Sequence, residues 1–104
     1  MNILEIEAAL SICERMMDKI QRELYSNNAM LGAVSGAYEV LTPDEKIIQK
    51  AKIQQLNYLI AYKTELLNYA ETVLNGGTPG SDPTLTIAQY TLPGGSPQDF
   101  DFSL

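Results

Sequence analysis

The feature that most constrains the fold is an unbroken heptad of apolar residues at the start of the chain. These residues alternate in steps of three and four, at Ile3, Ile6, Leu10, Cys13, Met17, Ile20 and Leu24. Such spacing lays one apolar stripe along an α-helix, which must pack against another helix. Asn2 can cap the first turn, with Glu5 as its reciprocal partner. The sequence therefore predicts a helix over residues 3–26, ending at the Ser-Asn-Asn of residues 26–28.

A second, longer helix is predicted over residues 43–75. Thr42 has the position of an N-cap, Pro43 follows at the first helical position, and Glu45 completes a capping box. The Asn-Gly-Gly of residues 75–77 is typical of a helix end. Both boundaries of this helix are therefore marked in the sequence.

Two apolar stripes run along the second helix. The first consists of Ile53, Leu56, Ile60, Leu67, Ala70 and Leu74, with Lys63 interrupting it. The second consists of Leu59, Tyr62, Leu66, Tyr69 and Val73. One antiparallel partner helix covers only one stripe, so the other is expected to contact a neighbouring subunit. Because tyrosine is enriched at interfaces, we predict that the second set packs between chains; the alternative is an ordinary half-buried core position.

The segment between the helices, residues 29–41, is apolar and contains glycines. Two structures fit it: an apolar loop that closes the end of the hairpin, or a short β-hairpin. In the second case residues 30–34 and 38–41 would be strands on either side of Ser35-Gly36. The sequence leaves this choice open.

The last part of the chain, residues 76–104, has the composition of an extended arm. It holds five glycines, four of the five prolines and no basic residue, yet residues 84–92 have a strand-like apolar pattern. We expect the arm to lack a core of its own and to dock on another chain, where residues 84–92 could add a strand to a sheet edge. The alternative is a disordered tail. The candidate docking residues are Leu85, Ile87, Tyr90, Leu92, Phe100 and Phe102.

The charge of the chain and its missing residue types exclude several functions. The formal net charge is −6, whereas nucleic-acid binding needs a basic stripe, so no nucleic-acid partner is expected. Histidine is absent, which removes the commonest general base and metal ligand. Glu14 and Asp18 lie four residues apart and are interpreted as a solvated charged face. We therefore expect no enzymatic activity, no cofactor and no metal.

Cys13 is the only cysteine, so no intramolecular disulfide can form, and its place in the apolar stripe indicates a small core residue. No apolar run approaches the length of a membrane span, and no signal peptide is visible at the start. We expect no membrane partner and assembly in a cytosol.

These patterns predict an all-α fold. Residues 1–75 form an antiparallel two-helix hairpin, with or without a small β-hairpin at the bend, and residues 76–104 form an extended docking arm. A hairpin of this size is marginal as a monomer, so oligomerisation or a partner is expected.

The order of these elements resembles that of the small head–tail connector proteins of tailed bacteriophages, also called head-completion or W-type adaptor proteins. In that family a helix leads into a β-hairpin and then into a helix with a tyrosine and leucine pattern. The comparable segments here are residues 37–42 (Ala-Tyr-Glu-Val-Leu-Thr) and 56–59 (Leu-Asn-Tyr-Leu). The resemblance covers residues 8–75 and includes no diagnostic motif. The second helix is longer here, the bend is less clearly polar, and the chain is acidic.

The resemblance implies a ring-forming structural protein of the virion neck, assembled in the host cytoplasm, whose arm grips the portal, another virion protein or a neighbouring copy. The alternative is a small acidic inhibitor or adaptor of the anti-restriction or anti-CRISPR type, which binds a basic site on a host protein. A connector is expected to form rings or higher oligomers and to occur stoichiometrically in particles. An inhibitor is expected to be a monomer or dimer whose binding depends strongly on salt.

Overall fold

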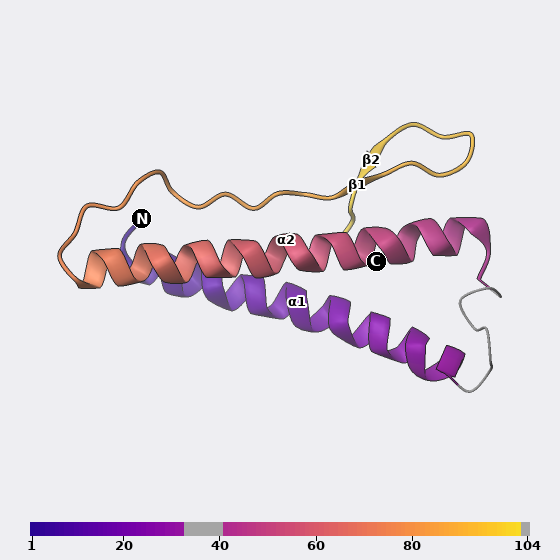
Figure 1. The fold of residues 1–104 in the computed structure, drawn as a ribbon, viewed down its shortest axis with the longest axis horizontal. Helices are drawn as coiled ribbons and strands as arrows, with labels where there is room; N and C mark the ends of the chain where they lie inside the picture. Colours follow the sequence, from indigo (N-terminus) through magenta and orange to yellow (C-terminus); the bar gives the residue numbers. More distant parts are fainter. Residues whose placement is uncertain (33–40, 103–104) are drawn as a thin grey trace.

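The chain forms a long two-helix hairpin with an extended arm folded back along it (Figure 1). The computed structural model describes residues 1–32 and 41–102, and it describes side chains for residues 1–24 and 41–102. The elements in chain order are α1 (Ile3–Gly32), α2 (Pro43–Leu74), β1 (Gln89–Tyr90) and β2 (Gln98–Asp99). The predicted all-α hairpin with an extended C-terminal arm is confirmed.

Both helices begin with the caps that the sequence predicts. In α1 the Glu5 backbone N–H donates to Asn2 Oδ1 at 2.8 Å, and the Asn2 N–H donates to Glu5 Oε1 at 3.1 Å. In α2 the Glu45 N–H donates to Thr42 Oγ1 at 3.2 Å, and the Thr42 N–H donates to Glu45 Oε1 at 3.4 Å. Each reciprocal pair satisfies two backbone donors that have no partner within the helix.

Helix α1 directs its heptad toward α2 but extends further than predicted. Ile6, Cys13 and Ile20 are buried. The helix does not end at residues 26–28 but continues to Gly32, because the Ala-Met-Leu that follows favours helix more than the short polar run disfavours it. Residues 30–32 are therefore helical and cannot begin the strand that was one of the two alternatives for residues 30–34. Residues 33–40, where the rest of the proposed bend hairpin falls, lie outside the described residues.

A glycine with a positive φ ends α2. Asn75 is the C-cap, and Gly76 after it has a φ of 77°. The Gly76 N–H donates to the Val73 carbonyl at 3.1 Å, and the Gly77 N–H donates to the Thr72 carbonyl at 2.9 Å. These are the two bonds of a Schellman motif, which needs the left-handed backbone that glycine adopts at little cost. The motif turns the chain so that the arm runs back along α2 (Figure 1).

The arm ends in a small β-hairpin. Strand β1 pairs antiparallel with β2, with Gln89 opposite Asp99. In the loop between them the Gly95 N–H donates to the Leu92 carbonyl at 2.9 Å, and Gly94, which follows a proline, has a φ of 77°. Proline followed by a positive-φ glycine defines a type II turn. The strand pairing of the described chain thus lies in the arm, and it is much shorter than the predicted strand over residues 84–92.

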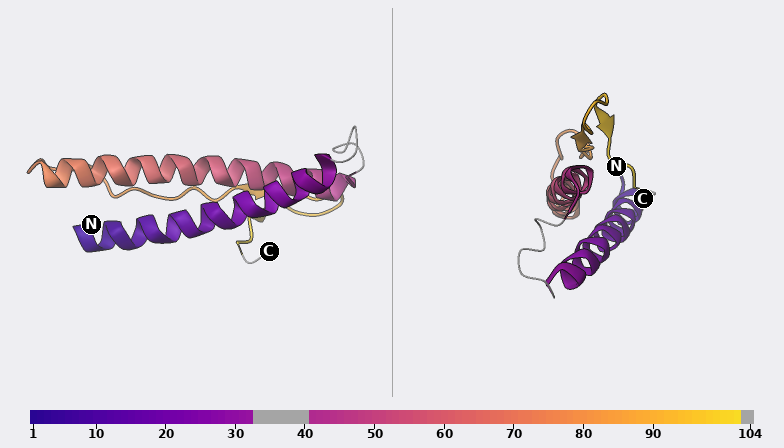
Figure 2. Two further views of the ribbon diagram at one scale, coloured as in Figure 1. Left: turned by 90° about the horizontal axis from the view of Figure 1, so that it is seen from below. Right: turned by 90° about the vertical axis from the view of Figure 1, so that its right-hand side faces the viewer.

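One hydrophobic core joins both helices and the arm. Its buried members are Cys13, Ile20, Ala51, Leu59, Ala88 and Phe100. Ala88 and Phe100 come from the arm, so the expectation that the arm has no core within its own chain is corrected. The helices alone leave apolar surface uncovered where they meet, and the arm covers one side of that junction as a third layer (Figure 2).

Candidate interaction surface

The α2 residues predicted to pack between chains lie within the fold of the monomer. Leu59 and Leu66 are fully buried, and Tyr62 packs against the core. Tyr69 and Val73 are half-buried. A second chain cannot reach Leu59 or Leu66 in this fold, so the prediction is corrected for these two residues. The reason is that α1 and the arm together supply the partners that a second subunit was expected to supply.

Four of the six residues of the other α2 stripe are exposed, while Leu56 packs against the core and Ala70 is half-buried. Ile53, Ile60, Leu67 and Leu74 are 47%, 45%, 49% and 73% exposed, respectively, and we call these four residues the α2 seam. A spacing of seven residues keeps side chains on one line along a helix, here over roughly 32 Å. None of the four belongs to the core cluster. An apolar row of this kind indicates a contact surface for another protein chain.

Lys63 interrupts the apolar stripe in the sequence, but its charge is directed toward Glu14 of α1. Its Nζ lies 3.3 Å from Glu14 Oε1, and a second bridge between the helices joins Lys52 Nζ to Glu23 Oε2 at 3.2 Å. Both partners of the Lys63 pair are more than one-third exposed, so the pair contributes at most about 1 kcal/mol to stability. The pair also holds the Lys63 side chain toward α1 and so keeps its charge away from the seam.

Most of the arm residues predicted to dock on another protein pack on the helices of their own chain. Phe100 is buried, and its ring meets that of Phe102 edge to face, with centroids 5.1 Å apart and an interplanar angle of 78°. Leu85 and Tyr90 also pack against the core. The remaining two are less enclosed: Leu92 is half-buried and Ile87 is 37% exposed. Docking of the arm on a second protein would require these residues to leave this site first.

Gln55 holds the middle of the arm, and no sequence pattern singled it out. Its side chain is fully buried on α2. Nε2 donates to the Thr86 carbonyl at 3.0 Å, and Oε1 accepts the Ala88 N–H at 2.7 Å. The carboxamide thus satisfies the acceptor and donor that a neighbouring strand would otherwise satisfy. In the sequence Gln55 is only a polar residue beside apolar ones. Its role can be recognised only when the position of the arm over it is known.

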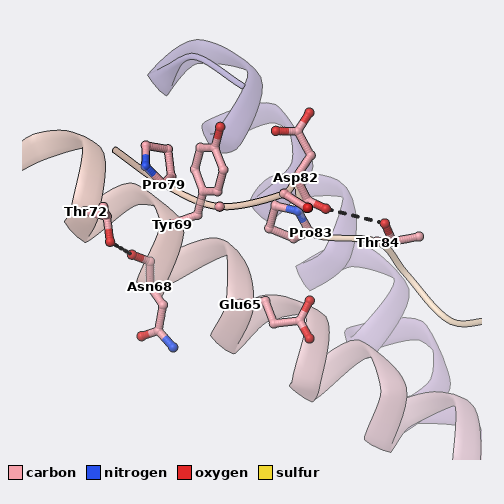
Figure 3. A pocket seen from close by; sticks show the side chains of 10 residues that line it. Glu65, Asn68, Tyr69, Thr72, Pro79, Asp82, Pro83 and Thr84 are labelled. Carbon is pink, nitrogen blue, oxygen red and sulfur yellow. Dashed lines mark hydrogen bonds between the residues drawn. The ribbon is translucent and has the colours of Figure 1, made fainter. Parts of the chain in front are cut away.

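An open cavity of about 550 Å³ lies where the arm begins its path along α2. Figure 3 shows Tyr69 rising from α2 toward the arm segment that carries Pro79 and Asp82. The Met1 amino group donates to Tyr69 Oη at 2.9 Å and to Asp82 Oδ1 at 3.2 Å. The hydrogen bond from the Met1 amino group to Asp82 lowers the pKa of Asp82 below its ordinary value. Partial desolvation, with the Asp82 carboxylate nearby, raises the pKa of Tyr69.

Asp82→Asn is expected to lower stability at neutral pH but not in strong acid. Because the folded-state pKa of Asp82 is lowered, its carboxylate stabilises the fold above the ordinary value of 3.8. That contribution is lost as the pH falls through the lower folded-state pKa. Thermal unfolding of both proteins between about pH 2 and 7 should give curves that converge at the acid end. Glu65→Gln in the same cavity is the matched control, and a constant difference at every pH would contradict the assignment.

Cys13 behaves as the core residue that the sequence predicts. Its Sγ donates to the Leu59 carbonyl at 3.4 Å within the buried core. Desolvation raises the pKa of the thiol; the Lys63 charge opposes this shift and the Glu14 charge adds to it. The reactive thiolate is therefore disfavoured.

Among the residues that the structure describes, no group of three or more potential metal ligands occurs. Neither α1 nor α2, over its described residues, combines the length and the apolar character that a membrane crossing requires. The feature of the described chain with the clearest bearing on function is the α2 seam. Comparisons of the chain with protein-family models, curated proteins and solved structures find no match.

Proposed function

We propose that this chain is a structural assembly protein that binds a neighbouring protein chain through the α2 seam. The observation that carries the proposal is the row Ile53, Ile60, Leu67 and Leu74, each about half exposed or more. Full burial of such a side chain contributes about 1.5–3 kcal/mol relative to full exposure, and the half that is still exposed contributes correspondingly less. Four on one line can support a helix-to-helix contact, and the proposal includes no catalytic step.

The setting we propose is the neck of a tailed bacteriophage virion, with assembly in the host cytoplasm. The support is the resemblance in element order to the small head–tail connector proteins. In this setting the seam contacts another copy, the portal or another virion protein. The arm would dock on a neighbour by exchange, since every copy carries the same site for it over its two helices.

The test is incorporation into particles. The wild-type chain is expected to sediment with phage particles from a producing culture at a fixed stoichiometry. Leu67→Asp is expected to reduce its incorporation by on the order of tenfold or more, because a carboxylate in the middle of an apolar contact costs at least 1.4 kcal/mol. Ala61→Asp adds the same charge on the exposed surface of α2 but off the seam, so it should incorporate normally.

Two results would contradict this proposal. One is a wild-type chain that remains free of particles and instead binds a single basic protein with strong salt dependence, which is the behaviour of an acidic inhibitor. The other is equal incorporation of Leu67→Asp and Ala61→Asp, which would mean that the seam is not the contact.

A further inference from the structure

We infer that the α2 seam binds the α2 seam of a second copy of this chain, with the two helices antiparallel. The inference rests on the proposed function and names the partner. Figure 2 shows α1 and the arm against two sides of α2, which leaves a third side uncovered. The seam is exposed along this helix, so a second helix can approach it without moving α1 or the arm.

The charges beside the seam favour an antiparallel arrangement. Lys52 and Lys63 of α2 are already paired with glutamates of α1. Lys50 and Glu71 are exposed, and neither forms an ion pair with a residue that the structure describes. Both lie along the same edge of the seam, the position that faces its own equivalent across an antiparallel helix pair. An antiparallel pair can set Lys50 against Glu71 of the second copy, whereas in a parallel pair this edge would face the opposite edge of the partner's seam.

One register pairs these charges together with three of the four seam residues, and it places Leu74 opposite Lys46 of the second copy. With Ile60 on the two-fold axis, Ile53 lies opposite Leu67 of the second copy, because each is seven residues from Ile60. Lys50 then lies level, within one residue, with Glu71 of the second copy. Two-fold symmetry forms every contact away from the axis twice, and antiparallel helix dipoles add to the preference. A two-fold contact of this kind is complete in a dimer. A larger ring would therefore need a second, different contact between dimers.

Charge reversal tests the pairing in the full-length chain. We expect sedimentation analysis at low salt to show a wild-type dimer. Lys50→Glu or Glu71→Lys alone should weaken dimerisation on the order of tenfold, because each creates two like-charge contacts per dimer. The double variant should recover to within about threefold of wild type. Arg15→Glu makes the same change in net charge as Lys50→Glu, on an exposed part of α1, and should leave dimerisation unchanged.

Disulfide trapping tests the register. Ile60→Cys should cross-link to itself under mild oxidation, since the two residues face each other on the axis. Ile53→Cys should not, because its two copies lie roughly 21 Å apart along the helix. A mixture of Ile53→Cys and Leu67→Cys should cross-link. The wild-type chain, whose Cys13 is buried, is the control.

A chain that remains monomeric, a double charge reversal that fails to recover, or self-linking of Ile53→Cys as readily as Ile60→Cys would overturn the inference. These results are separable from failure of the proposed function. A monomeric chain whose entry into particles still requires Leu67 overturns self-pairing and leaves the assembly role standing.

Discussion

Leu66→Asp is expected to unfold the monomer, whereas Leu67→Asp, one residue later, is expected to leave it folded. Leu66 is fully buried and Leu67 is 49% exposed. At position 66 the change removes apolar packing worth about 2–5 kcal/mol and buries a carboxylate, which costs several kcal/mol more. A domain of this size is stable by only about 5–15 kcal/mol. At position 67 the carboxylate remains in water, so we expect a change within about 1 kcal/mol.

Far-UV circular dichroism with urea titration measures the difference. At a protein concentration low enough to keep the wild-type chain monomeric, Leu66→Asp should lack most of the wild-type helical signal, and Leu67→Asp should unfold at nearly the wild-type midpoint. If the two variants unfolded at the same urea concentration, the packing of α2 described above would not hold in solution. Leu66→Asp is therefore unsuitable for association experiments, because an unfolded chain loses every contact at once.

Gln55→Ala is expected to release the arm while the two helices stay paired. The change leaves the Ala88 N–H without a partner at a buried position and the Thr86 carbonyl without one at a partly buried position. The cost is about 1–3 kcal/mol for the buried group and less for the other. Undocking of the arm removes this cost, because it returns both groups to water. Hydrogen exchange at the Ala88 amide should accelerate strongly, and residues 84–92 should become sensitive to protease. The helical signal should fall much less.

Two further variants sharpen this test. Gln55→Glu keeps the shape and an acceptor for the Ala88 N–H, but its carboxylate repels the Thr86 carbonyl. We expect its arm to be released at neutral pH and to dock again in acid, when the carboxyl group regains a donor. Gln54→Ala changes the exposed neighbour and should have little effect. Unchanged exchange at Ala88 in Gln55→Ala would show that the glutamine does not hold the arm.

The sequence predicts the helix boundaries best where local chemistry decides them. The reciprocal caps at Asn2 and Thr42 and the glycine stop at Gly76 each depend on residues within a few positions of one another. The end of α1 was predicted too early, because a short run of serine and asparagine lowers helix preference only slightly.

The sequence does not predict which stripe of α2 faces outward. Leu66 and Leu67 are adjacent, chemically identical and part of stripes with the same period, so pattern alone cannot separate them. The choice depends on the arm, which covers one side of the hairpin through contacts such as Gln55 with Ala88. That contact joins residues far apart in the chain, and a carboxamide taking the place of a strand leaves no periodic signal.

The position of the arm in the core has a consequence for synthesis in the cell. The ribosome makes both helices before Ala88 and Phe100, so the hairpin can form while its arm site is still empty. At about 5–20 residues per second, the remaining residues take seconds to appear. Until the arm docks, the hairpin exposes apolar surface on two sides, the arm site and the α2 seam. Copies emerging from neighbouring ribosomes on one messenger could pair at either side, and docking of the arm then closes one of them.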